Sequence, residues 1–113
     1  NMGIIGIKAA KPDFVATIAK TVRKYRYISI SEIKALVLEG RYLYECDYID
    51  AQGIEGILSI HSELNNNGIA TVIYEHDQET TPEFLNNLLE SYAETAKQVE
   101  EEMDREALLE EGE

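Results

Sequence analysis

The stretch Gly-Ile-Ile-Gly-Ile-Lys-Ala-Ala at residues 3–10 is short and rich in isoleucine, as expected of a β-strand. Pro12 suits the first turn of a helix, and Asp13 suits the positive end of the helix dipole. From residue 13 to about residue 27, apolar side chains recur at spacings of three and four, which is typical of an amphipathic helix. The chain is therefore predicted to open with a strand and a helix with a basic outer face.

A second helix and a second strand are predicted next. Ser29-Ile30-Ser31-Glu32 has the spacing of a capping box, so this helix begins at Ser29 or Ser31 and ends at Gly40. Residues 41–49 alternate in character, as expected of a strand. The alternation places four residues on one side of it, which predicts an aromatic face: Tyr42, Tyr44, Cys46 and Tyr48.

The rest of the chain predicts a helix, a strand and a final long helix. Asp50 can cap a third helix that Asn-Asn-Asn-Gly at residues 65–68 ends, and residues 69–75 form a third strand. Residues 77–81 form a polar turn, after which Thr81-Pro82-Glu83 starts the long helix. The fold class is α+β. We expect a two-layer β-α-α-β-α-β domain with a three-stranded antiparallel sheet in residues 1–77, followed by an acidic C-terminal helical extension in residues 78–113.

The charge of −12 on the 113 residues is concentrated in that extension. Residues 1–77 hold eight Lys or Arg against ten Asp or Glu, a balance of −2, whereas residues 78–113 hold two against twelve, a balance of −10. Like charges crowd the end of the helix, so its last ten or so residues are expected to fray. The excess of negative charge argues against nucleic acid and against anionic membranes as partners. With a single cysteine, no signal-peptide pattern and no long apolar run, a cytoplasmic location is expected.

Two neighbouring stretches carry a family resemblance. Ile18-Ala19-Lys20-Thr21-Val22-Arg23 is followed after a short spacer by Ile30-Ser31-Glu32-Ile33-Lys34-Ala35-Leu36-Val37. Together with the order of elements over about residues 4–75, they resemble the C-terminal domain of the bacterial ribosomal stalk protein. The Clp protease adaptor that binds N-terminal degrons shares that fold. In the stalk family this surface docks translational GTPases, so the resemblance implies that Lys20, Arg23 and Lys34 contact a protein partner.

No residue pattern in the chain favours catalysis or a cofactor. His61 lies on the apolar stripe of the third helix, where a semi-buried, hydrogen-bonded histidine is the ordinary case. His76 and Cys46 lack a partner at the spacing of a zinc site. There is no phosphate-binding glycine loop and no His-Glu-x-x-His motif. We therefore expect a non-enzymatic protein without a metal or other cofactor.

The strands are apolar or aromatic on both sides, so the face of the sheet opposite the helices needs a cover. The first turns of the long helix are the natural cover for Tyr42, Tyr44 and Tyr48, either from the same chain or from a second copy in a homodimer. The residues expected to provide it are Phe84, Leu85, Leu88, Leu89 and Tyr92.

These features predict a non-enzymatic protein–protein interaction module that binds a protein partner through the basic helix pair or through the tail helix. The alternative is a small acidic inhibitor, such as an immunity protein, that blocks a basic toxin or nuclease by presenting carboxylates where nucleic acid would bind.

Overall fold

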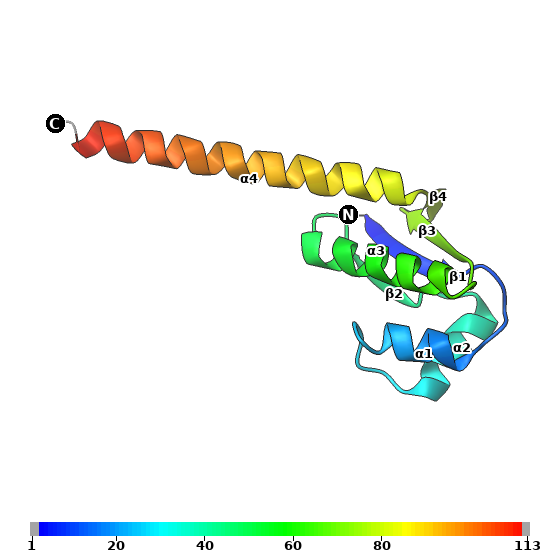
Figure 1. The fold of residues 1–113 in the computed structure, drawn as a ribbon. Coiled ribbons are helices and arrows are strands. Elements are labelled where there is room, and N and C mark those ends of the chain that lie inside the picture. Colours follow the sequence, from blue (N-terminus) through cyan, green and yellow to red (C-terminus); the bar gives the residue numbers. More distant parts are fainter. Residues whose placement is uncertain (1–2, 112–113) are drawn as a thin grey trace. The chain divides into compact units, whose positions relative to one another are not determined.

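The computed structural model describes residues 3–111, with side chains as far as residue 109. The chain divides into two compact units, residues 1–82 and residues 83–113. The first unit is an α+β domain, and the second consists of most of one long helix, α4 (Pro82–Glu111) (Figure 1). The boundary follows residue 82, five residues later than the sequence suggested, because residues 78–80 belong to the sheet.

The sheet has four strands in the order β2-β1-β3-β4, and all neighbours are antiparallel. The strands are β1 (Ile4–Ala9), β2 (Tyr44–Asp47), β3 (Thr71–Glu75) and β4 (Gln78–Thr80). The expected three-stranded sheet is therefore corrected to four strands, since β4 lies where a polar turn was predicted. His76 and Asp77 join β3 to β4 with φ values of 51° and 64°, and a two-residue hairpin turn of this kind needs positive φ at both positions.

Three helices complete the first unit: α1 (Ala16–Val22), α2 (Ile30–Glu39) and α3 (Ala51–Asn66). α3 packs on β1, β2 and β3, α1 packs against α3, and α2 packs against α1 (Figure 1). The core between these elements consists of fully buried aliphatic side chains, namely Ile5, Ile7, Ile18, Val22, Ile33, Leu43, Ile54, Ile57, Ile60 and Leu64.

The predicted helix boundaries are confirmed where the sequence carries a cap. The hydroxyl of Ser29 accepts a hydrogen bond from the backbone N–H of Glu32 at 3.1 Å, and α2 ends at Gly40 with φ 66°. The carboxylate of Asp50 accepts a bond from the N–H of Gly53 at 3.0 Å, which starts α3. α4 begins at Pro82 as predicted. Side-chain caps and a left-handed glycine depend only on neighbouring residues, so the helix ends that they predict agree with those of the folded structure.

α1 is shorter than the predicted helix over residues 13–27. It begins at Ala16, and its N-cap residue, Val15, is extended and makes no side-chain cap bond. Pro12 and Asp13 therefore lie in the loop after β1 and do not start the helix. After Val22 the chain continues in a helical-type turn, with the N–H of Arg26 bonded to the carbonyl of Val22 at 3.0 Å. This turn explains why the apolar spacing continues beyond the end of α1.

Tyr42 and Tyr44 lie on opposite faces of the sheet, which corrects the expected single aromatic face. Tyr44 pairs with Ile7, and its ring faces α3, where a Cβ on Gly56 would lie 3.6 Å from it. The ring of Tyr42 lies over Gly6 on the other face, where a Cβ would come within 2.5 Å of the ring. The chain bends at Leu43, just before β2, and the bend interrupts the alternation.

α4 is helical through Glu111. Residues 112–113 lie outside the described residues, so the fraying expected for the last ten or so residues stays a prediction. Among residues 3–111, no helix combines the length and the apolar character needed to cross a bilayer.

Candidate functional site

A shallow groove of about 250 Å³ lies along α1 and the first residue of α2. We call it the helix-pair groove. Four of its lining residues are apolar, namely Phe14, Ala16, Ala19 and Ile30. The other two are the cations Lys20 and Arg23. Two of the lining residues on α1 are alanines, and their small side chains leave room beside the helix.

The cations predicted to bind a partner gather at this groove. Lys20 and Arg23 follow Ala16 at positions four and seven residues later, so the three share one side of α1. Lys34 does not line the groove, but it lies one turn beyond Ile30 on the same side of α2. All three cations are exposed. Within the described residues none of them takes part in an ion pair, so their charges are available to a partner.

Lys24 belongs to the same basic stretch of sequence but is engaged internally. Its Nζ lies 2.5 Å from Oε1 of Glu63, and the contact ties the end of α1 to α3. The hydrogen bond to Glu63 raises the pKa of Lys24, and the same bond lowers the pKa of Glu63. Lys24 therefore holds two helices of the domain together, and the exposed cations at or beside the groove are Lys20, Arg23 and Lys34.

Apolar side chains stand exposed around these cations. Ile30 is 51% exposed and Leu38 is 53% exposed. Since Ile30, Lys34 and Leu38 are spaced four residues apart, they form one stripe along α2. Val15, at the start of α1, is 45% exposed. Exposed apolar side chains that are grouped with charges are typical of surfaces that bind another protein.

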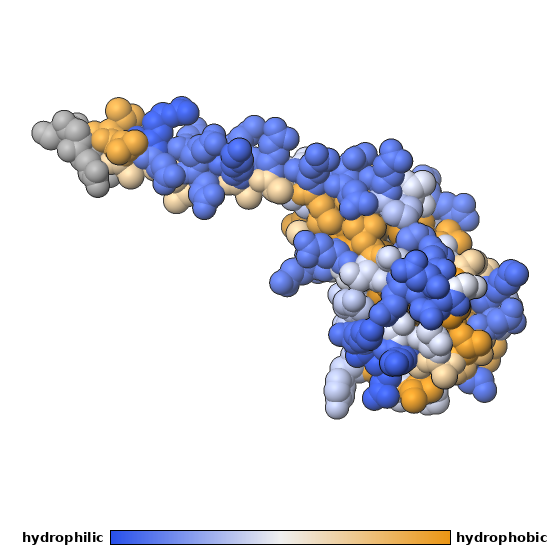
Figure 2. Space-filling view, in the orientation of Figure 1, coloured by the Kyte–Doolittle hydropathy of each residue, from blue (hydrophilic) through white to orange (hydrophobic). Residues whose placement is uncertain are grey.

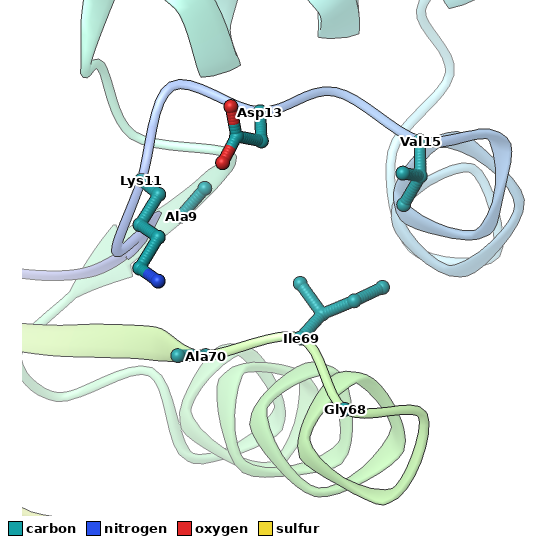
Figure 3. A pocket seen from close by; sticks show the side chains of 7 residues that line it. All are labelled: Ala9, Lys11, Asp13, Val15, Gly68, Ile69 and Ala70. Carbon is teal, nitrogen blue, oxygen red and sulfur yellow. The ribbon is translucent and has the colours of Figure 1, made fainter.

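A second hollow, of about 270 Å³, is lined by Val15 and by residues at the end of β1 and just before the start of β3 (Figure 3). Figure 3 shows the side chains of Val15 and Ile69 facing this hollow, while Lys11 and Asp13 come from the loop above it. Lys11 and Asp13 carry opposite charges, so together they add no net charge to the hollow, and no ion pair joins them among the described residues. The sequence did not reveal this hollow, because Pro12 and Asp13 in the loop after β1 predict the start of a helix.

Tyr42 and Tyr74, on the face of the sheet turned away from α3, are held by contacts within the domain. The ammonium group of Lys8 lies 4.7 Å from the ring centroids of both Tyr42 and Tyr74, and these two rings meet edge to face at 5.9 Å. The hydroxyl of Tyr42 donates to Asp77 at 2.6 Å, and burial raises the pKa of Tyr42. Lys8 and Tyr74 were not singled out from the sequence. The cluster forms only when β1 and β3 pair, so no local pattern indicates it.

Tyr48 and the residues of α4 predicted to cover the sheet are the remaining members of the predicted sheet-cover site. Tyr48 stacks on His76, with ring centroids 5.1 Å apart and an angle of 16° between the planes. The cover residues fall in the first three turns of α4: Phe84, Leu85, Leu88, Leu89 and Tyr92. Their role in covering the sheet or in self-association stays a prediction.

His61 and Cys46, whose residue types are common in catalytic sites, have surroundings typical of structural residues. Nδ1 of His61 lies 2.8 Å from the hydroxyl of Thr71, and burial lowers the pKa of His61. Burial also raises the pKa of the Cys46 thiol to about 12, with a smaller contribution from Asp50. Within the described residues no three His, Cys, Asp or Glu side chains are grouped so that they could hold a metal ion. Neither histidine lines the helix-pair groove or the second hollow.

The structure thus brings two of the three predicted partner contacts, Lys20 and Arg23, into one groove and places Lys34 next to it. It places Tyr42 and Tyr44, which were expected to share a face, on opposite faces of the sheet. Comparison with known proteins finds no matching family model, no matching curated protein and no matching solved structure.

Proposed function

We propose that this chain is a non-enzymatic protein-binding module of the cytoplasm, and that its partner docks on the helix-pair groove. One observation carries the proposal: an apolar groove lies open beside three cations that have no ion-pair partner among the described residues. Apolar surface supplies the free energy of binding, while the cations select the orientation and the sign of the partner's charge. The order of elements on which the resemblance to the stalk domain depends is also that of the folded chain through β3.

Site-specific crosslinking tests the proposal. A photo-crosslinking residue introduced in place of Ile30 lies in the groove, and the same residue in place of Ile49 provides the control, since Ile49 is 63% exposed but far along the chain, between β2 and α3. In cells that make the protein naturally, position 30 should yield one dominant protein adduct that position 49 does not yield.

Charge reversal then tests the cations. Changing Lys20, Arg23 and Lys34 to Glu should abolish the adduct at position 30. Reversing three other exposed cations, Arg41, Lys97 and Arg105, changes the net charge equally and should leave the adduct in place. Equal crosslinking from positions 30 and 49, or an adduct that survives reversal of the groove cations, would argue against the proposal.

The acidic inhibitor is the second candidate function, and the charge of α4 favours it. α4 holds ten acidic residues against two basic ones, a balance of −8. A basic toxin or nuclease would be captured by this helix and not by the groove. Changing Glu100, Glu101 and Glu102 to Gln should then abolish capture, whereas reversal of Lys20, Arg23 and Lys34 should leave it unchanged.

A further inference from the structure

The second half of α4 carries an exposed strip that complements the helix-pair groove. Val99 and Met103 lie one turn apart and are 50% and 64% exposed. Glu102 and Glu106 fall on the same side of the helix, because residues three, four and seven positions apart share a face. These four residues, which we call the acidic strip, combine two apolar side chains with two carboxylates.

The strip keeps a net negative charge beside the cations of its own helix. Lys97 falls on a side of α4 turned away from the strip at 100° per residue, whereas Arg105 follows Glu102 by three residues and lies beside the edge of the strip. Figure 2 shows most of the visible surface of α4 as hydrophilic. A long, strongly negative helix with an apolar stripe favours a cationic partner surface over a second acidic helix, because two such helices repel each other.

The groove matches the strip in charge, apolar character and length. Lys20 and Arg23 are the cations of the groove, and Ile30 and the alanines form its apolar part. Ala16 and Arg23, the first residue of α1 and its C-cap residue, are seven residues apart, as are Val99 and Glu106 on α4, and seven residues of helix span about 10 Å. Two helices laid side by side over this length can bring both cations to both carboxylates.

We propose that the helix-pair groove binds the acidic strip of a second copy of this chain. Val99 and Met103 cover the apolar floor, while Glu102 and Glu106 pair with Lys20 and Arg23. The proposal rests on the groove being the docking surface named above, and it adds that the protein's own helix is one of its ligands. Because two different surfaces meet, the contact is head to tail: two copies exchange strips reciprocally, or the assembly grows. An external partner would compete with this self-association.

A charge swap between two full-length variants tests the contact. The groove variant carries Lys20→Glu and Arg23→Glu, and the strip variant carries Glu102→Lys and Glu106→Lys. Each variant alone presents like charges at the contact, so its self-association, measured by sedimentation velocity at low salt, should weaken about tenfold or more relative to the wild type. Mixing the two variants joins opposite charges at both contacts and should restore assembly. Salt should weaken assembly of the wild type, because the charges are exposed.

Matched controls separate this contact from a general charge effect. Glu101→Lys with Asp104→Lys makes the same charge change on the far side of α4, and Arg41→Glu with Lys97→Glu does so away from the groove; both should associate like the wild type. A monomeric wild type at low salt, or a mixture that assembles no better than its components, would overturn the proposal. Assembly of the groove variant at wild-type strength would also overturn it, and would point to pairing of α4 helices instead.

The same variants distinguish this proposal from the proposed function. If the wild type is monomeric but the groove variant loses its crosslinked partner, the proposal of self-association is wrong and the proposed docking function is supported. If the mixed variants assemble but the partner adduct survives reversal of the groove cations, the function fails and self-binding stands.

Discussion

The ring of Tyr42 lies directly against the backbone of Gly6, so that a Cβ at position 6 would come within 2.5 Å of the ring. The ring cannot easily move away, because its hydroxyl is bonded to Asp77 and Lys8 lies over its face. Gly6→Ala should therefore destabilise the protein by about 1–3 kcal/mol, the usual cost of overpacking. Chemical denaturation monitored by circular dichroism measures this change, and an unchanged midpoint would show that the ring is free to shift.

Gly56→Ala should have the opposite effect. A Cβ at this position would meet Tyr25 and Tyr44 at 3.6 Å, an ordinary van der Waals distance, and Gly56 lies inside α3. Glycine in a helix interior is less favourable than alanine by roughly 0.5–1 kcal/mol. The free energy of unfolding should rise by about that amount in the same denaturation experiment. A loss of stability would mean that α3 approaches β2 too closely for a methyl group.

Cys46 should react slowly with thiol reagents while the protein is folded. Burial raises the pKa of its thiol to about 12, and the thiolate is the reactive form, so little of it is present near neutral pH. Alkylation followed by mass spectrometry should give slow modification under native conditions and rapid modification in denaturant. Equal rates in the two conditions would contradict the half-buried position of Cys46 between β2 and α3.

His61 should make the protein less stable as the solution is acidified. Burial lowers the pKa of His61 in the folded state, so the unfolded chain binds the proton more readily. The stabilisation is complete above the ordinary pKa of histidine and is lost as the pH falls through the lower pKa of the folded state. His61→Gln should therefore reduce the acid-induced fall in the free energy of unfolding. Denaturation curves at neutral and mildly acidic pH, compared between wild type and variant, measure the difference; parallel falls would rule out this role of His61.

The sequence predicted those parts of the fold that depend on short-range chemistry. Ser29, Gly40 and Asp50 fix helix ends through bonds to neighbours within a few residues, and all three act as predicted. The strand β4 was missed because its three residues are polar and belong to the edge of the sheet. Only the positive φ values of His76 and Asp77, which the residue types do not require, turn the chain back against β3.

The candidate site shows the same division. The spacing of Lys20 and Arg23 on α1 was readable from the sequence, but the groove between them and Ile30 depends on how α2 packs against α1. The separation of Tyr42 from Tyr44 depends on a bend at Leu43, where a strand period alone suggests continuous alternation. Long-range packing decides such features, so a local pattern cannot supply them.

The two outermost strands, β2 and β4, are only four and three residues long. An additional strand pairing with either edge strand could form few backbone hydrogen bonds. The carboxylates of Glu45, Asp47 and Glu79 would also repel an added strand that carries negative charge. We therefore expect the short edge strands to oppose stacking of the domain into fibrils through the borders of its sheet.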